Sequence, residues 1–440
     1  MKSIHCIVVL GLSTVLTASL APAQTPGSAA DHASSSDDQR PRINFTDYLN
    51  DVIRWNLDLA AQRSAIAISR AGVTTASAQP DWSVDFGLPS VDLSGQGSPT
   101  SFSTGLALPI ELGGKRSARV RAAAADVGTT NADYEDAVRQ SRASAADAFI
   151  AALSARDIVQ SKHKSLGEFD RIVSVNEERH RVGEIGEIEL TQSRVERDQF
   201  RADVITAEAD VYSADVTLAQ QLGQPQRLSM QLPVPSGRLD VPVRTFAVEQ
   251  LVADALQTRS DVVSRTRALK AADLHLELAR ANLVPDLSVS GSYGHTGTGT
   301  GGFSQPPDNT IGASISFNLP FSRRLHPGEI EAAGATKTQA EIQLRSAQLR
   351  AEFEVRDAYS RYMASVQRLQ LYQGGMLKDA DRVLEARLYA YQRGGATLLE
   401  VIDAERTSAD VYLAYSQALA DHAHALVALE LAAGIWDISF

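Results

Sequence analysis

Four short segments of the chain alternate between apolar residues and small or polar ones. They begin at Trp82, Phe102, Leu287 and Ile311, and in each the apolar residues fall on alternate positions. This period of two places successive side chains on opposite faces of a β-strand. A membrane β-barrel strand with a water-filled interior has this pattern, and so does a half-buried strand of a soluble sheet. We predict strands at about residues 82–90, 102–110, 286–294 and 310–320.

Long stretches of the chain predict helices. Proline is absent between Pro109 and Pro225 and after Pro327, and both stretches are rich in the helix formers Ala, Glu, Arg, Gln and Leu. A single helix over residues 113–182 would be roughly 105 Å long at about 1.5 Å per residue. Such a length indicates a coiled coil or a barrel of helices, with an ordinary helical bundle as the simpler alternative.

The C-terminal stretch has the apolar spacing of a coiled coil, with alternating steps of three and four residues. Its apolar positions are Leu398, Ile402, Ala409, Tyr412, Leu419, Ala423 and Leu426. Glu405 and Ser416 occupy two positions of this seam at which an apolar residue is expected. The two patterns together predict a mainly α protein. A long α-helical coiled-coil barrel would carry a membrane β-barrel portion of four strands per protomer.

The two halves of the chain resemble each other. The segment PDWSV at residues 80–84 matches PDLSV at 285–289, and Leu108-Pro109 matches Leu319-Pro320. Gly183 and Gly394 are 211 residues apart, the same separation as between the two Leu-Pro pairs. Gly223 and Gly434 have this separation as well. A constant offset over so many residues predicts an internal duplication.

The duplication divides the chain into a first structural repeat over residues 43–223 and a second over residues 245–440. A linker with four prolines, residues 224–244, joins them. Before the first repeat, residues 1–23 have the basic start, apolar stretch and small residues of a signal peptide. Residues 24–42, rich in Ser and Asp, are expected to be disordered. The only cysteine, Cys6, lies within the predicted signal peptide, so the mature chain is expected to form no disulfide.

Charge and hydropathy narrow the function. The formal net charge of −11 argues against nucleic-acid binding, which requires a basic surface. Beyond the predicted signal peptide no stretch approaches the length of a transmembrane helix, so any membrane-spanning part would consist of strands. Four strands cannot close a barrel, and an open edge in lipid leaves backbone groups unpaired. We therefore expect an oligomer that shares one barrel.

This combination resembles the TolC-like outer-membrane factor family over essentially the whole mature chain. The resemblance implies a homotrimer with a twelve-stranded barrel in outer-membrane lipid and a helical barrel that extends through the periplasm. It also implies two partners, a periplasmic adaptor (membrane fusion) protein and an inner-membrane efflux pump.

One short motif resembles a particular branch of this family. Residues 108–116, with the sequence LPIELGGKR, are similar to the strand-to-helix junction of the CzcC-like branch, which serves heavy-metal cation pumps. In this motif Gly113 and Gly114 are expected to form a hinge. The basic side chains that follow are expected on a solvated face. They are Lys115, Arg116, Arg119 and Arg121.

The resemblance also implies functional positions. The turns equivalent to those at Gly183 and Gly394 form the periplasmic tip of the family, which opens and docks against the adaptor. Glu400 and Asp403 match a segment whose acidic residues line the narrowest aperture, the periplasmic gate. A solvated acidic face is the alternative for these two residues, because residues three apart share one side of a helix.

The family resemblance also implies a latch between helices. Tyr391 and Glu189 match family positions that hold neighbouring helices together while the gate is shut. The basic latch residue of the family falls at Ala396 here, so we expect the latch to differ from that of the family.

The chain offers little for catalysis or ligand binding. Its nine histidines are scattered, and His422 and His424 lie about 200° apart around a helix, so they cannot share one metal ion. We found no catalytic or cofactor motif. We therefore expect no enzyme, no cofactor and no metal site. The main hypothesis is a passive exit channel of a tripartite efflux pump, with divalent heavy-metal cations as candidate substrates. The alternative is a periplasmic coiled-coil scaffold without channel activity.

Overall fold

The computed structural model describes residues 40–88, 101–223, 232–297, 306–317, 325–438 and 440. Residues 41–440 form one unit, to which the following description refers. The predicted signal peptide lies outside the described residues, as do residues 24–39 of the segment expected to be disordered and residues 224–231 of the linker.

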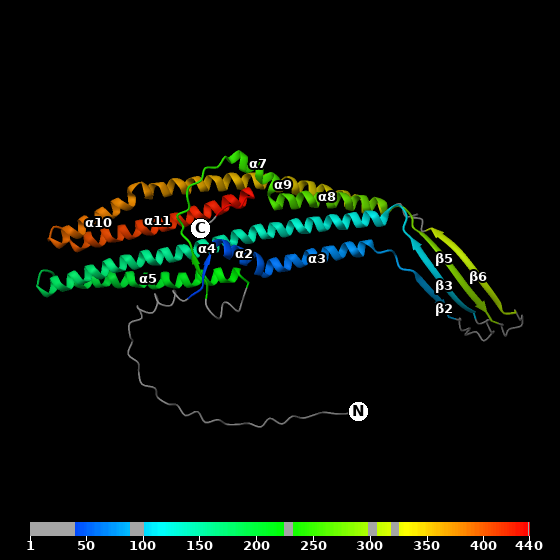
Figure 1. The fold of residues 1–440 in the computed structure, drawn as a ribbon, viewed down its shortest axis with the longest axis horizontal. Coiled ribbons are helices and arrows are strands. Elements are labelled where there is room, and N and C mark those ends of the chain that lie inside the picture. Colours follow the sequence, from blue (N-terminus) through cyan, green and yellow to red (C-terminus); the bar gives the residue numbers. More distant parts are fainter. Residues whose placement is uncertain (1–39, 89–100, 224–231, 298–305, 318–324, 439) are drawn as a thin grey trace, which may run out of the picture. The chain divides into compact units, whose positions relative to one another are not determined.

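Groups of two or more consecutive helices are separated along the chain by one or two strands (Figure 1). The strands are β1 (Arg42–Asn44), β2 (Ser83–Gly87), β3 (Ser101–Ile110), β4 (Val234–Ser236), β5 (Leu287–Thr296) and β6 (Asp308–Phe317). The helices are α2 (Phe45–Trp55), α3 (Leu57–Ser77), α4 (Lys115–Arg181), α5 (Glu187–Gln221), α7 (Val248–Thr258), α8 (Ser260–Ala281), α9 (Leu325–Leu371), α10 (Leu377–Gln392) and α11 (Leu398–Ala433). A π-helical segment, η2 (Tyr372–Met376), separates α9 from α10.

The helix α4 confirms the single long helix that was expected. Its 67 residues correspond to about 100 Å. Near the strands α4 packs against α3 and α8, and α8 packs against α9; farther along, α4 packs against α5 and α11, and α11 packs against α10. The flanking helices are therefore α3 and α9 near the strands, and α5 and α10 farther from the strands. No helix among the described residues is both long and apolar enough to cross a membrane.

The four strands predicted from alternation form one antiparallel sheet in the order β2-β3-β5-β6. Residues 89–90 and 318–320 of the predicted strands lie outside the described residues. The register pairs Val84 with Leu106, and Tyr293 with Ile311. Because partners in a register share a face, the large apolar residues of all four strands lie on one face. That face also carries Thr104, Gly291, His295 and Asn309, and the other face carries small or polar residues.

The junction between β3 and α4 is more tightly held than the sequence indicated. Gly113 and Gly114 both have a left-handed backbone, with φ of 69° and 71°. Lys115, the first residue of α4, is buried and its ammonium group contacts the Asp286 carboxylate at 2.8 Å. Arg119 contacts Glu111 and donates to backbone oxygens at the end of α3. The expected solvated basic face is therefore wrong for Lys115, because the strand and helix ends meet there.

The duplication is visible in repeated helix ends. Gly183, after α4, and Gly394, after α10, have φ of 79° and 73°. In the same way Gly223, after α5, and Gly434, after α11, have φ of 62° and 71°. Each pair is 211 residues apart. The second repeat differs at η2, where Gly375 has φ of 141° between two helices that otherwise continue each other.

A second, smaller sheet crosses the middle of the helices. The three-residue strands β1 and β4 pair in parallel, and alternation over so few residues gave no signal for them in the sequence. The largest core lies nearby, where α2, α4, α9 and α11 bring together large apolar side chains. In this core Phe45 contacts Phe149 and the C-terminal Phe440, with ring centroids 5.3 and 4.7 Å apart.

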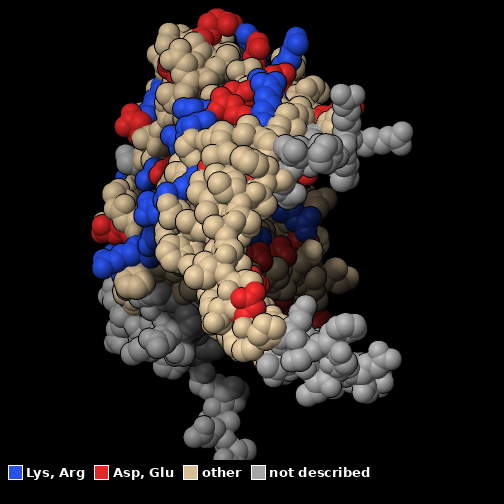
Figure 2. Space-filling model, turned by 90° about the vertical axis from the view of Figure 1, so that its right-hand side faces the viewer, with Lys and Arg blue, Asp and Glu red and all other residues tan. Residues whose placement is uncertain are grey.

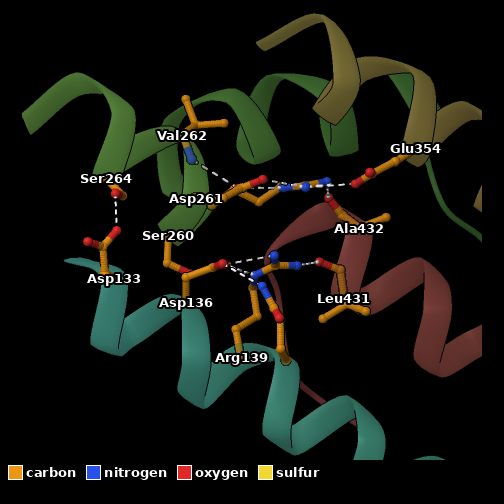
Figure 3. A network of polar contacts seen from close by, with 12 residues as sticks. Asp133, Asp136, Arg139, Ser260, Asp261, Val262, Ser264, Glu354, Leu431 and Ala432 are labelled. Atoms are coloured by element: carbon orange, nitrogen blue, oxygen red, sulfur yellow. Dashed lines mark hydrogen bonds and ion pairs between the residues drawn. The ribbon is translucent and has the colours of Figure 1, made fainter. Parts of the chain in front are cut away.

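A polar network fixes the place where α4, α8, α9 and α11 converge (Figure 3). Arg259, immediately before α8, is only 2% exposed. Its guanidinium contacts Asp261 and Glu354 at 2.7 Å each and donates to the backbone oxygen of Ala432 at 3.1 Å. Arg139 of α4 donates to the oxygen of Leu431 at 3.0 Å. Both arginines thereby bind backbone oxygens near the end of α11, which a helix leaves without intrahelical partners.

Candidate functional site at the ends of the long helices

The turns between α4 and α5 and between α10 and α11 lie at the same end of the helices, opposite the strands (Figure 1). A small apolar cluster joins them. Its buried members are Phe169 and Ile172 of α4, Tyr391 of α10, and Leu398, Val401 and Ile402 of α11. Burial of these side chains fixes one helical hairpin against the other. All the candidate site residues lie on these two hairpins or in their turns.

Gly183 and Gly394 occupy exposed turns, as the repeat predicted. Their positive φ angles close the preceding helices, and their amides donate to the oxygens of His180 and Tyr391. A side chain added at either glycine would meet no atom within 4 Å. The two turns therefore present bare backbone, with free space around it, at the end of the helices.

The two candidate gate residues have different surroundings. Glu400 is the third residue of α11, and its carboxylate accepts from the amide of Thr397 at 2.8 Å in a capping box. It also contacts the Arg387 guanidinium of α10 at 2.9 Å. The hydrogen bonds from Thr397, together with Arg387, lower the pKa of Glu400, so the residue stays ionised. Asp403 lies one turn farther along α11 and is exposed.

The candidate latch residue Tyr391 is buried at the boundary between the hairpins. Its hydroxyl donates to Oδ1 of Asn176 at 2.5 Å, and Arg179 lies over its ring at 4.6 Å. Burial raises the pKa of Tyr391; the charge of Arg179 acts against this shift, and the charge of the nearby Glu189 carboxylate adds to it. Asn176 and Arg179 are both on α4. The hydroxyl thus joins α10 to α4 through a hydrogen bond to Asn176, and not to Glu189, which lies on α5.

Sequence reasoning had no means of finding Asn176. It lies 215 residues from its partner, in the other repeat, and an isolated asparagine within a helix carries no functional signal. Arg387 was missed for a similar reason. It provides a positive charge beside Glu400 from α10, although the family position for a basic residue falls at Ala396.

The two histidines near the end of α11 have separate partners. His422 is buried and its ring contacts the hydroxyl of Ser365 at 3.1 Å, whereas His424 contacts Asp147 at 2.6 Å. In the part of the chain that the structure describes, no group of three or more His, Cys, Asp or Glu residues is placed to hold a metal ion.

The chain matches the family model described as outer membrane efflux protein over residues 49–224 and 251–435. Pyoverdine export outer membrane protein OpmQ of Pseudomonas aeruginosa is 24% identical over 309 residues, 70% of this chain and 64% of that protein. Cobalt-zinc-cadmium resistance protein CzcC of Cupriavidus metallidurans is 24% identical over 300 residues, 68% of this chain and 69% of that protein.

Among solved structures, the CmeC outer membrane channel of Campylobacter jejuni has the same fold. It superposes with a TM-score of 0.74 at 18% sequence identity, over 94% of this chain and 89% of that one. The family model covers most of both repeats, including the two turns and the whole of α11. The chain belongs to the outer membrane efflux protein family, in agreement with its resemblance to TolC-like channels.

Proposed function

We propose that this protein is the exit channel of a tripartite efflux pump, and that it conducts substrates passively from an inner-membrane pump and its adaptor to the exterior. Membership of the family makes it an outer-membrane efflux protein with a periplasmic helical extension, and not an enzyme. The assembly, its partners and its substrate are the proposal.

The observation that carries the proposal is the sheet β2-β3-β5-β6. Its two outer strands, β2 and β6, have no further strand partner among the described residues. One face carries exposed large apolar side chains, among them Phe86, Ile311 and Phe317. Asp85 and Asp308 are the only Asp, Glu, Lys or Arg residues within the four strands, and the register places both on the polar face.

These two faces fit lipid on one side and water on the other. Figure 2 looks from the end at which the strands lie, and the mostly uncharged surface in its foreground contrasts with the charged helices behind. Apolar side chains facing lipid and polar ones facing a wet interior are the arrangement of a membrane barrel. The unpaired edges require more strands, which further copies of the same chain can supply. Following the family resemblance, we propose a homotrimer with a twelve-stranded barrel.

The flanking helices support the same assembly. Exposed apolar residues recur on α5 with steps of seven and four, at Ile205, Tyr212 and Val216. The same steps occur on α9, at Ile342, Leu349 and Phe353. Such spacing forms the contact seam of a coiled coil. Within one chain α5 packs mainly against α4, so its exposed seam is available to a neighbouring copy.

Fractionation and reconstitution test the proposal. The mature protein should be recovered with the outer membrane, should form a trimer that dissociates on heating, and should conduct ions in planar bilayers. The competing scaffold without channel activity predicts a water-soluble periplasmic protein that leaves the bilayer conductance unchanged. A stable monomer without detergent would contradict the channel.

We further propose that Glu400 and Asp403 line the gate, and that Tyr391 and Glu189 belong to the latch. Three copies would place six carboxylates near one axis, which favours cations in a narrow mouth. Because Arg387 offsets the charge of Glu400, Asp403→Asn should reduce cation preference more than Glu400→Gln does. Tyr391→Phe, which removes only the hydroxyl, should raise the open probability without changing selectivity. If all variants have the same selectivity, Glu400 and Asp403 do not line the gate and form only a solvated acidic face.

The turns at Gly183 and Gly394 are the proposed contacts of the adaptor. Their open surroundings leave room for a partner's backbone to approach. Cysteines placed beside these turns should form crosslinks to the adaptor in cells, and bulky replacements should abolish efflux while outer-membrane insertion persists. Crosslinks to cell-surface components instead would reverse the proposed orientation.

Divalent heavy-metal cations are the candidate substrates. The acidic residues at the helical end favour cations, and the name of one relative, cobalt-zinc-cadmium resistance protein CzcC, refers to three such metals. The name of another relative, OpmQ, refers to pyoverdine. Deletion of the gene should therefore be followed by growth tests with zinc, cobalt, cadmium, nickel and copper, and with organic toxicants. Sensitivity to organic compounds alone would contradict cation export.

A further inference from the structure

Glu405 places a carboxyl group inside the contact between the two helical hairpins. It lies in the apolar seam of α11, one turn after Val401 and Ile402, and only 2% of the residue is exposed. One of its oxygens, Oε2, has no hydrogen-bond partner. The Ser165 hydroxyl of α4 is the side-chain hydrogen-bond partner of the carboxyl group. A core position of a helix contact thus holds an acid that is only half satisfied.

The charged groups around Glu405 are one lysine and two acids. From α4, Lys164 and Glu168 act on it, and from α10, Asp381. Lys164 lies over the ring of Tyr412 at 4.7 Å, and the Tyr412 hydroxyl donates to Asp381 at 2.7 Å.

Glu168 has a partner of its own. Its carboxylate contacts the Arg171 guanidinium at 2.7 Å. In the described part of the chain, no Lys, Arg or His forms an ion pair with Glu405. Two of the three charged neighbours are themselves acidic, and they oppose a negative charge on it.

Burial therefore raises the pKa of Glu405 to about 7, with Glu168 and Asp381 acting in the same direction and the Ser165 hydrogen bond and the Lys164 charge acting against it. An acid whose pKa is higher in the packed state than in the open state binds more protons when packed. The protonated carboxyl therefore contributes fully to hairpin packing at pH values below the ordinary pKa of a glutamate. That advantage is lost as the pH rises through about 7, where the buried carboxyl becomes charged.

We propose that a proton on the buried Glu405 carboxyl holds the α10–α11 hairpin against α4, and that its loss loosens the helical end of the protein. Charging this group without a partner is costly in an apolar contact. The cost falls when the hairpin moves and water reaches the carboxylate. Because Asn176 and Tyr391 join the same two hairpins, the movement would also strain the candidate latch. The link to channel opening rests on the proposed function, whereas the link to hairpin packing does not.

Hydrogen exchange of the detergent-solubilised oligomer tests the packing directly. Protection factors, corrected for the intrinsic pH dependence of exchange, should be measured over α11 between pH 5.5 and 8.5. In the unsubstituted protein, protection of residues 398–412 should fall at least several-fold as the pH passes through about 7. Glu405→Gln, of equal size but unable to ionise, should keep the low-pH protection throughout. Asp410→Asn, an exposed acid on the same helix, should retain the fall.

A second variant and a second measurement keep the outcomes separate. Glu405→Leu should behave like Glu405→Gln, so a folding defect of one variant leaves the other to decide. In bilayers the open probability of the unsubstituted channel should rise over the same pH range, and that of Glu405→Gln should not. Protection independent of pH, or a full pH response in both Glu405 variants, overturns the inference. A protein that shows the exchange response but never conducts overturns the channel instead.

Discussion

Arg259 shows how one buried charge can organise several helices. It stands between α7 and α8, and its guanidinium contacts carboxylates of α8 and α9 and a backbone oxygen of α11. Burial alone would lower the pKa of Arg259, but the hydrogen bonds and charges of Asp261 and Glu354 raise it overall. The residue therefore stays charged, and its contacts depend on both acids.

Replacing Arg259 should destabilise the protein through the groups left behind. In Arg259→Leu the two carboxylates and the Ala432 oxygen lose their donor, and leaving such groups unsatisfied costs about 1–3 kcal/mol. Arg265→Leu is the matched control, because Arg265 is exposed and its loss should cost less than about 0.5 kcal/mol. Thermal unfolding followed by circular dichroism compares them. Equal melting temperatures would show that the network contributes nothing.

Local sequence patterns predicted most of the helices and strands. The alternation of Trp82–Leu88 and of the three later segments predicted the sheet, because period two in a strand needs no knowledge of distant residues. The long proline-free stretch predicted α4. The strands β1 and β4 were missed because three residues are too few for a period and their partners lie 192 residues apart.

The site was predictable only where it is local. The repeat located the turns at Gly183 and Gly394, and the family resemblance pointed to the acids that follow the second turn. It did not give the pairing of Tyr391 with Asn176 or of Glu400 with Arg387, because these contacts depend on how helices align in space. Glu405 could be predicted only in part. The seam identified it as an unexpected residue in an apolar position, but its neighbours on α4 and α10 came from the structure.

The helix-terminating glycines Gly183 and Gly223 allow a test of how closely the ends of the helices pack. Gly223 and Gly183 both have positive φ, but an added Cβ would lie 2.6 Å from the Trp55 backbone oxygen at Gly223 and would meet nothing within 4 Å at Gly183. Gly183→Ala should therefore cost about 1–2 kcal/mol for the left-handed backbone. Gly223→Ala should cost about 1–3 kcal/mol more, because α5 must shift away from the α2–α3 junction. Melting curves should separate the two, and equal losses would contradict the contact.

For the whole molecule, the described sheet and the flanking helices have the same requirement. The outer strands β2 and β6 of the described sheet have backbone groups without a strand partner. The helices α5 and α9 carry exposed apolar seams. One closed ring of copies satisfies both at once, because the strands and the helices of each copy belong to the same continuous chain. A substitution that weakens the helical seam should therefore destabilise the whole oligomer but leave the fold of each chain intact.

Ile205 is the position at which this can be measured. It is 61% exposed on α5, in the proposed seam with a neighbouring copy. Ile205→Glu would place a charge in that seam and remove about 2 kcal/mol of apolar burial from each interface, so the trimer should dissociate at a lower temperature. Gln199→Glu adds the same charge at another exposed position of α5 and should leave dissociation unchanged. Native electrophoresis after graded heating measures both, with circular dichroism to verify that helix content is retained. If the two variants dissociate at the same temperature as the unsubstituted protein, α5 does not face a neighbouring copy, and the ring must close through another helix.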